Sequence, residues 1–222
     1  MKKGVSLLEA MLSLFLGSFI LIAGNNFLIN VRNLGERAKL VSERTAEKSL
    51  SLFQMTSIIR KAGEGIKPEF AIELKNNEMI VRRAVSSFEV IQNCNEEDRL
   101  IKTFCSDCKV GRKVFLSGDL YEIKEKGGDY IVLDRGVKDF VKKGEKVNLV
   151  KEFIFTSDSK GTYLKIDRGS FQLITDKYFE LKFSNFSNSV VKISGKEKVN
   201  NEKSEFDYYV FLPYVAINGG GR

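Results

Sequence analysis

The sequence contains no histidine and no tryptophan, and it has only two prolines, Pro68 and Pro213. Without histidine the chain cannot build a Ser-His-Asp triad, a Cys-His dyad or an imidazole metal site, which removes most general-base chemistry at neutral pH. A glycine-rich phosphate loop is also missing, because the triplet Gly219–Gly221 opens no helical segment. We therefore expect a protein that is not an enzyme and that uses no metal and no cofactor.

The composition is that of a folded chain. Of the 222 residues 43% are hydrophobic, and they recur along the whole sequence, which argues against disorder. If the first 60 or so residues form a helix outside the body, the remaining ~160 suffice for one globular domain with its own core. The formal net charge of +7 comes from 36 basic and 29 acidic residues, scattered along the chain, and is a weak argument for nucleic acid as a partner.

The N-terminal segment is apolar and almost free of charge. From residue 4 to residue 31 the only ionisable side chain is Glu9. At about 1.5 Å per residue, a helix of this length spans the roughly 30 Å of a bilayer's hydrocarbon core. Two lysines, Lys2 and Lys3, precede it. They predict that the chain starts in the cytoplasm and that the bulk of it lies outside.

Three interpretations of this segment compete. A secretory signal has a shorter apolar core followed by a small-residue cleavage site, whereas this run continues into a helical pattern. A simple single-pass anchor fits the apolar length but leaves Glu9 unexplained. A carboxylate inside hydrocarbon costs about 2–3 kcal/mol even on lenient scales, so its presence asks for a partner.

The third interpretation supplies that partner. The opening Lys-Lys-Gly-Val-Ser-Leu-Leu-Glu, residues 2–9, resembles the class III signal of type IV prepilins. The resemblance implies cleavage by prepilin peptidase between Gly4 and Val5, N-methylation of Val5, and pairing of Glu9 with the new amino group of a neighbouring subunit. At low dielectric such a pair is much stronger than in water, although burial offsets part of the gain.

Two departures and one alternative accompany the resemblance. Family members most often carry Phe or Met after the cut, where this chain has Val5, which puts methylation in question more than cleavage. The family's frequent proline in the second half of the span is replaced by Gly24-Asn25-Asn26, a weaker break in helix propensity. The alternative to the pairing role is that the dipole of its own helix alone stabilises Glu9.

Beyond the span the pattern stays helical to about Ala62. Apolar residues at three- to four-residue steps predict one buried face: Leu34, Ala38, Val41, Thr45, Leu52 and Met55. Gly63, Gly65 and Pro68 are the expected stop. We expect a single helix of about 55 residues, with two helices bent at residues 24–26 as the alternative.

After Pro68 the apolar period changes to two, which predicts strands. The expected runs begin at Met79, Lys113, Leu120, Tyr130, Val147, Glu152, Thr162, Phe171, Tyr178 and Phe206. Tyr208 and Tyr209 are expected in the core or at a sheet edge, and the Lys/Glu/Asn-rich segment 195–204 is expected to be a mobile surface loop. The fold class is therefore α+β, with a long N-terminal transmembrane and amphipathic helix packed on an antiparallel β-sheet head, the arrangement of a pilin. The expected parts are a leader (residues 1–4), a membrane and filament-core half of the helix (5–31), an amphipathic half (32–65) and the head (66–222).

The head resembles one branch of the same family. Arg60-Lys-Ala-Gly63 is similar to the helix-ending Arg-x-Ala-Gly signature of PilW-type minor pilins and PulJ-type minor pseudopilins. The stretch from residue 111 to 183, with Gly118-Asp119 and the run Tyr163–Arg168, is similar to the middle of those proteins.

Three cysteines, Cys94, Cys105 and Cys108, fall within fifteen residues. In an oxidising compartment we expect a disulfide that joins Cys94 to Cys105 or Cys108 around the charged stretch 95–99, worth about 3 kcal/mol. The alternatives are a CxxC redox pair, which lacks a thioredoxin-like βαβ context, and a zinc site, for which Asp107 or Glu97 is a poor fourth ligand.

Two basic clusters complete the set of candidate sites. They comprise Lys109, Arg112 and Lys113, and Lys138, Lys142, Lys143 and Lys146. We expect solvated strand faces and turns, with DNA contact as the sharper alternative. Around Asp158 a calcium loop is not expected, because Thr156–Lys160 offers one acid and a lysine.

The resemblance implies a function. We expect a minor type IV pilin, a non-catalytic subunit that helps initiate assembly or forms the pilus tip. The alternatives are a minor pseudopilin of a type II secretion system and a DNA-uptake or adhesive module at a pilus tip. The implied partners are other major and minor pilins through the N-terminal helix, prepilin peptidase and the inner-membrane assembly platform, with DNA or a surface as an unproven contact. The implied location is the inner membrane, with the head outside the cytoplasm, and then the extracellular filament.

Overall fold

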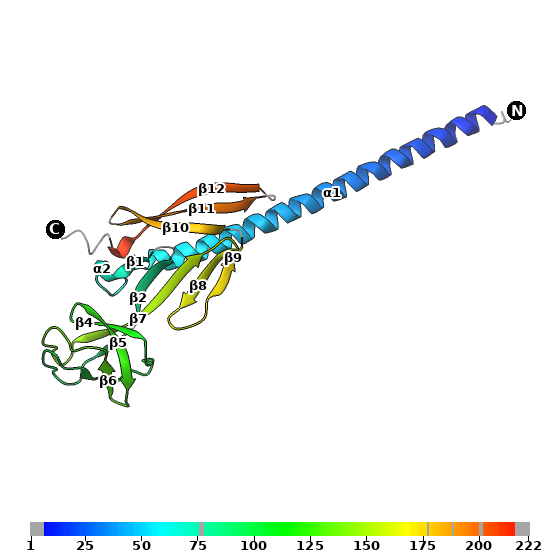
Figure 1. Cartoon of the computed structure of the whole chain (residues 1–222). Coiled ribbons are helices and arrows are strands. Elements are labelled where there is room, and N and C mark those ends of the chain that lie inside the picture. The colour runs from blue at the N-terminus through cyan, green and yellow to red at the C-terminus, as the bar shows by residue number, and fades with distance from the viewer. Residues whose placement is uncertain (1–6, 76–77, 177, 188, 200–201, 216–222) are drawn as a thin grey trace. The chain divides into compact units, whose positions relative to one another are not determined.

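The computed structural model describes residues 7–75, 78–176, 178–187, 189–199 and 202–215. The protein is α+β, with one long helix followed by antiparallel strands, as Figure 1 shows, and this arrangement is compatible with a pilin-like architecture. The chain divides into two compact units, Met1–Leu50 and Ser51–Arg222.

The first unit contains most of helix α1, which runs from Leu7 to Arg60. Its 54 residues form one uninterrupted helix, so the expected single helix of about 55 residues is confirmed. Helix α1 continues through the weak point at residues 24–26, because apolar flanks of good helix formers outweigh three poor ones. The side chains of the predicted stripe at Leu34 and Val41 are exposed within the chain, and burial begins at Ser51. The sequence therefore predicted the helical stripe but not where burial starts along it.

The second unit, Ser51–Arg222, begins with the last turns of α1. From here on the word head means this unit, which starts earlier than the expected boundary at residue 66. Met55 and Ile59 of α1 are buried in it. After Arg60 the backbone turns at Gly63 and Gly65, which have φ angles of 83° and 69°, a left-handed conformation that glycine adopts without strain. The predicted stop is thus where the chain reverses.

The head consists of a nine-stranded sheet and a three-stranded sheet. The larger sheet has the order β1-β2-β7-β4-β5-β6-β3, with β8 paired to β7 and β9 paired to β8, and the smaller has the order β10-β11-β12. Helix α2 is Pro68–Ala71, and the strands are β1 Ile72–Lys75, β2 Glu78–Glu89, β3 Leu100–Lys102, β4 Lys113–Leu116, β5 Asp119–Lys126, β6 Tyr130–Leu133, β7 Lys146–Ser157, β8 Thr162–Ile166, β9 Gln172–Thr175, β10 Tyr178–Ser187, β11 Val190–Val199 and β12 Glu202–Phe211. All pairings between these strands are antiparallel.

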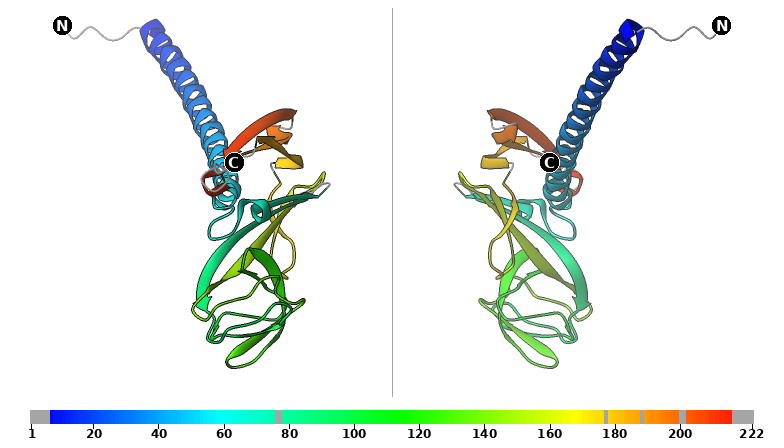
Figure 2. Two further views of the ribbon diagram at one scale, coloured as in Figure 1. Left: turned by 90° about the vertical axis from the view of Figure 1, so that its left-hand side faces the viewer. Right: turned by 90° about the vertical axis from the view of Figure 1, so that its right-hand side faces the viewer.

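Two hydrophobic cores lie in the head, where the sequence led us to expect one. The helix core contains the end of α1, residues of β2 and β7, and the inner face of the three-stranded sheet. The disulfide core contains the three cysteines with residues of β3 to β7. Strands β2 and β7 are long enough, at 12 residues each, to contribute to both cores. Figure 2 shows the two strands running side by side through the head.

All the predicted strands exist, and the runs at Val147 and Glu152 join into the single strand β7. Strands β1, β3 and β11 were missed. The expected loop at residues 195–204 is wrong: most of it belongs to the hairpin of β11 and β12, apart from residues 200 and 201, which lie outside the described residues. Its charges are compatible with strands because they pair across the hairpin, for example Lys196 opposite Glu205.

Candidate functional site

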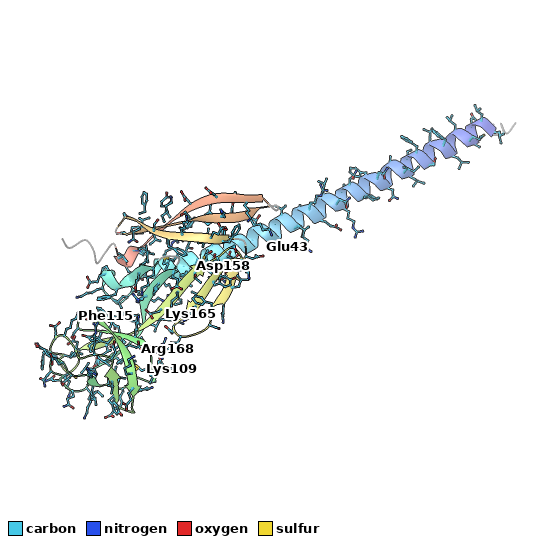
Figure 3. All side chains as sticks on the ribbon, in the orientation of Figure 1. Glu43, Lys109, Phe115, Asp158, Lys165 and Arg168 are labelled. Atoms are coloured by element: carbon cyan, nitrogen blue, oxygen red, sulfur yellow. A yellow bond between two sulfur atoms is a disulfide. The ribbon has the colours of Figure 1, made fainter. Side chains whose placement is uncertain are left out.

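The first candidate site is the apolar length of α1. Residues Leu7–Glu43 form a 37-residue candidate span that contains an 18-residue window with a mean hydropathy of 2.1, and none of that window is buried within the chain. Figure 3 shows its side chains standing out around the helix. About 20 such residues suffice to cross a bilayer, so the segment is long and apolar enough for a single-pass anchor.

Glu9 lies in the first turn of this helix. A carboxylate there is favoured by the partial positive charge of the helix N-terminus, which agrees with both roles considered for it. The predicted peptidase site between Gly4 and Val5, and the methylation of Val5, lie outside the described residues. Cleavage, methylation and the pairing of Glu9 with a neighbouring subunit therefore stay predictions.

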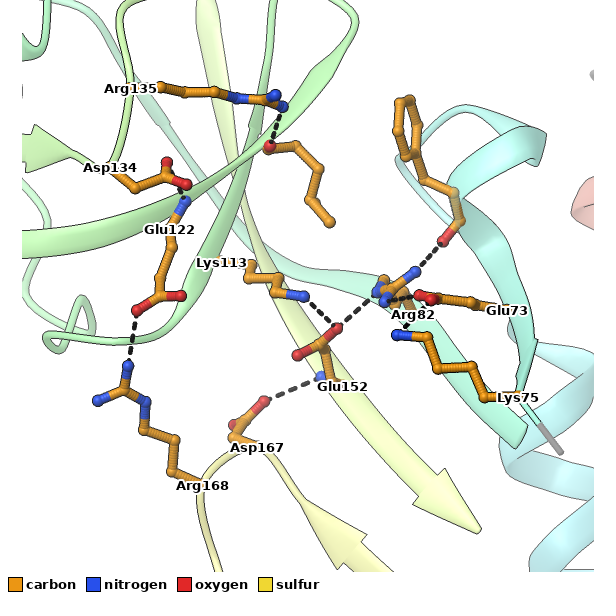
Figure 4. A network of polar contacts seen from close by, with 12 residues as sticks. Glu73, Lys75, Arg82, Lys113, Glu122, Asp134, Arg135, Glu152, Asp167 and Arg168 are labelled. Atoms are coloured by element: carbon orange, nitrogen blue, oxygen red, sulfur yellow. Dashed lines mark hydrogen bonds and ion pairs between the residues drawn. The ribbon is translucent and has the colours of Figure 1, made fainter. Parts of the chain in front are cut away.

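The second candidate is a charged network between the two cores. Arg82 of β2 lies opposite Glu152 of β7, and its Nε is 2.5 Å from Oε1 of that residue. Its Nη2 contacts Glu73 on the neighbouring strand β1, and Lys113 of β4 reaches the same Oε1 of Glu152 at 2.8 Å. Figure 4 shows these side chains from β1, β2, β4 and β7 pointing toward one another.

Mutual neutralisation favours the charged forms of Glu73, Glu152 and Arg82. A hydrogen bond from Lys75, then one from Arg82, lowers the pKa of Glu73 from 4.5 to about 2. Burial acts to raise the pKa of Glu152, but hydrogen bonds from Lys113 and Arg82 outweigh it, and the pKa lies below its ordinary value. Burial likewise opposes the charge of Arg82, yet the two carboxylates raise its pKa. A proton-transfer group would need a pKa near neutrality, so this network fits a structural role.

A second set of ion pairs connects the turn after β8 to strands β4 and β5. Asp167 binds Arg112 at 3.0 Å and accepts the backbone N–H of Glu152 at 2.9 Å. Arg168 binds Glu122 at 2.6 Å. The guanidinium of Arg168 lies directly over Gly111, where a Cβ atom would be 1.8 Å from its Cζ. The segment Tyr163–Arg168, which carried part of the family resemblance, thus serves to hold two parts of the head together.

The cysteine pairing predicted from the sequence is wrong. The disulfide joins Cys105 to Cys108, whose Cα atoms are 5.5 Å apart in a turn, and Cys94 is a buried free thiol. Cys94 is held elsewhere by its backbone, which exchanges hydrogen bonds with Val141. No disulfide therefore closes the expected loop around residues 95–99.

The disulfide does not fit the zinc site considered for these cysteines. The sulfurs of Cys105 and Cys108 are bonded to each other and largely buried, so they do not offer thiolates to a zinc ion. Within the described part of the chain, no group of three His, Cys, Asp or Glu residues is arranged to hold a metal. Asp158 accepts hydrogen bonds from the backbone N–H groups of Lys160 and Gly161, which stabilise a turn.

The basic clusters are partly neutralised by acids of the same chain. Arg112 binds Asp167, Lys113 binds Glu152, and Lys138 lies 2.6 Å from the buried carboxylate of Asp119. Burial would raise the pKa of Asp119, but Lys138, the backbone and Arg135 lower it. These pairs reduce the charge that the clusters present to a phosphate backbone.

The outer face of the three-stranded sheet combines a polar groove with exposed rings. The groove has a volume of about 460 Å³ and is lined by Glu180, Lys182, Ser194, Gly195, Lys196, Glu205, Phe206 and Asp207. On the same sheet, Phe186 and Tyr209 pack edge to face with centroids 5.0 Å apart. Tyr209 is exposed and Tyr208 packs against the helix core, as expected for sheet-edge and core residues.

Comparison with known proteins adds no relative: no protein-family model, no curated protein and no solved structure matches the chain.

Sequence reasoning found the apolar helix and Glu9 but missed the charged network and the face of the three-stranded sheet. Arg82 and Glu152 are 70 residues apart, and no short motif signals their contact. The signal for the sheet face was present in the alternation of β12, where Glu205, Asp207 and Tyr209 are exposed and alternate with the less exposed Phe206, Tyr208 and Val210.

Proposed function

We propose that this protein is a minor type IV pilin: a non-catalytic subunit, cleaved after Gly4, that helps initiate assembly or forms the tip of a filament. The observation that carries the proposal is the uninterrupted helix α1, with its exposed apolar length at Leu7–Glu43 and a carboxylate in its first turn. One element of this kind serves two purposes. It anchors the subunit in the membrane before assembly and packs against other helices afterwards.

The charge of Glu9 determines the axial position at which an incoming subunit joins the filament. In the membrane the carboxylate is costly, and the free amine that cleavage would create at Val5 of a neighbouring subunit offsets that cost. Subunits whose apolar helices lie out of register cannot form the pair. Glu9 thus sets the axial position of an incoming subunit, while the head supplies the contacts that distinguish one subunit from another.

The head supports a binding role more than a catalytic one. Its charged side chains at Arg82, Glu152 and Asp167 are engaged in ion pairs that connect strands. The ion pairs within the basic clusters make DNA a less favoured partner than protein. A minor pseudopilin shares the same helix, and purification of the filament in which the chain is incorporated distinguishes the two assemblies.

The proposal is tested by the intact mass of the protein from cells with and without prepilin peptidase. We expect the mass of a chain that begins at Val5, with or without one methyl group, only when the peptidase is present. A mature chain that still begins at Met1, or one that is cut beyond Ala23, contradicts the proposal.

Glu9 is tested separately. Glu9→Ala is expected to be cleaved normally but to be absent from filaments, whereas Glu9→Asp keeps the charge and is expected to retain part of the incorporation. Normal incorporation of Glu9→Ala removes the pairing role and leaves the dipole explanation.

A further inference from the structure

Strand β12 is an edge of the three-stranded sheet, since it pairs with β11 alone among the described strands. Figure 1 shows it on the outer side of that sheet, with β11 between it and β10. An edge strand presents unpaired N–H and C=O groups, and natural proteins limit pairing there with short strands, bulges, prolines or charges. The edges of this head differ in how they are protected.

The other described sheet edges are short or irregular. Strands β1, β3 and β9 have only four, three and four residues. Strand β10 has ten, but its register shifts twice, between Phe179 and Lys182 and between Asn185 and Ser187. It also bonds to neighbouring segments, because the N–H of Glu180 donates to Asp158 and the Thr162 hydroxyl donates to Tyr178.

Strand β12 lacks three of these protections, because it is long, regular and free of proline, and its charged side chains are confined to residues 202–207. Its ten residues pair with β11 without a register shift, and no proline interrupts them. The nearest proline, Pro213, comes after the strand has ended. A long, regular and aromatic edge of this kind is a template for another strand.

The ladder identifies which backbone groups face the open edge. The N–H of Leu212 donates to Ser189 at 2.8 Å, so this pair belongs to the hydrogen-bonded class of an antiparallel ladder. Hydrogen-bonded and non-bonded pairs alternate, and the register is regular. The N–H and C=O groups that point away from β11 are therefore those of Lys203, Glu205, Asp207, Tyr209 and Phe211.

We infer that β12 receives an extended segment of a different protein chain, which adds to the three-stranded sheet as a fourth strand. The backbone of the edge requires an extended partner, because only a strand satisfies a row of alternating donors and acceptors. The side chains specify its chemistry. Tyr209 and Phe211 are exposed rings, which favour apolar residues opposite them, and Glu205 and Asp207 favour lysine or arginine.

The neighbouring strand β11 already shows this charge pattern. Lys192 of β11 binds Asp207 at 2.8 Å, and Lys196 lies opposite Glu205. A second copy of this chain does not repeat the pattern, because Lys203 is the single basic residue of β12 and no register of two β12 strands places a basic residue opposite both Glu205 and Asp207. In an antiparallel pair of β12 strands centred on Phe206, Glu205 lies opposite Asp207 of the second copy. In a pair centred on Asp207, the two Asp207 carboxylates face each other, and like charges opposite one another are destabilising.

The inference rests on the proposed role as a subunit that assembles with other chains. The test therefore monitors the edge and the helix separately in the full-length protein in its own cells. Tyr209 or, in a parallel strain, Leu34 of α1 is replaced by the photo-crosslinking residue p-benzoylphenylalanine. The Tyr209 probe is combined with Glu205→Pro, which removes one edge N–H, or with its matched control Glu205→Ala, which keeps it.

We expect the Tyr209 probe to crosslink to an extended segment of one other protein. Glu205→Pro should reduce that product by about tenfold or more, and Glu205→Ala by much less. The Leu34 probe should crosslink equally in all backgrounds. Glu205→Lys, which keeps every N–H but opposes a basic partner, should also weaken the Tyr209 product. The Glu205→Lys variant keeps the inference testable if Glu205→Pro fails to fold. Such a failure would be revealed by rapid alkylation of Cys94 under native conditions.

Several outcomes overturn the inference. Equal Tyr209 products from the proline and alanine variants exclude pairing through the edge. A product that joins two copies of this chain excludes a different partner. Products from Leu34 with none from Tyr209 remove the strand addition and leave the proposed function standing, whereas no product from either probe contradicts both.

Discussion

Arg82 and Glu152 face each other across β2 and β7, and their ion pair lies where these strands pass from one core to the other. The side chains are only 7% and 16% exposed. Val81 and Phe153, next to them, belong to the helix core, and Phe88 and Leu149 farther along pack in the disulfide core. Because side chains alternate along a strand, Arg82 and Glu152 lie on the face of β2 and β7 opposite to Val81, Leu149 and Phe153, so the pair supplies polar contacts on the face away from these core residues.

Arg82→Ala should destabilise the head by about 3 kcal/mol, because it leaves the largely buried Glu152 with Lys113 as its remaining partner. Lys124→Ala is the control, since it removes an exposed ion pair with Glu122 and should cost less than about 0.5 kcal/mol. Denaturant unfolding of the full-length protein in detergent compares the two. Equal effects would show that burial adds nothing to the pair.

The same network predicts an acid-sensitive head. The pKa of Glu73 is lowered from 4.5 to about 2, so the carboxylate binds protons more weakly in the folded state than in the unfolded state. Its contribution is present above the unfolded pKa and is lost as the pH falls from about 5 toward 2. Glu73→Gln should flatten the fall in unfolding free energy over that range, measured by denaturant unfolding at several pH values. An unchanged slope would remove Glu73 from the acid response.

The disulfide pairing predicts a specific pattern of thiols. Under denaturing, non-reducing conditions the wild type should show one free thiol, at Cys94, and Cys94→Ala should show none. In the native protein Cys94 should resist alkylation, because burial raises the pKa of its thiol and excludes the reagent. Peptide mapping checks both, and a peptide pair that joins Cys94 to Cys105 or Cys108 would contradict the structure.

Gly111 and Gly144 form a matched pair. Both have positive φ angles, 83° and 86°, but a Cβ atom at Gly111 would collide with Arg168, whereas at Gly144 nothing lies within 4 Å. Gly144→Ala should cost about 1–2 kcal/mol from backbone strain alone, and Gly111→Ala about 1 kcal/mol more.

A double-mutant cycle assigns that excess. In an Arg168→Ala background the two glycine substitutions should cost the same, because the obstructing guanidinium is gone. Thermal unfolding of the three single and two double variants, each compared with its background, provides the measurement. A persistent excess at Gly111 would mean that backbone contacts, not Arg168, account for it.

The helix and most strands were predictable because each follows from a local period. An apolar run with helix-forming neighbours predicts α1, and two-residue alternation predicts both halves of β7, although it did not reveal that they continue as one strand across the charged Lys151-Glu152. In the missed strand β11, Val191 and Ile193 are the buried residues among those whose burial is described, and the charged run Lys196-Glu197-Lys198 lies in its second half. Those charges are compatible with a strand through their partners on β12, which a local period does not reveal.

The candidate sites divide in the same way. Glu9 stands out in the sequence because it is the only ionisable side chain between residues 4 and 31. The cysteine pairing was mistaken because three cysteines within fifteen residues allow several connections, and the backbone bridge between Cys94 and Val141 decides among them. The open edge of β12 depends on which strands lie beside it, and this is a property of the sheet order.

The two cores share β2 and β7, and this has a mechanical consequence. The hydrogen bonds between these strands lie across the strand direction. A pull directed along β2 and β7 loads the bonds together, in shear, whereas a pull across the strands would open them one after another. The ladder that joins the cores is therefore strongest against tension along its own length.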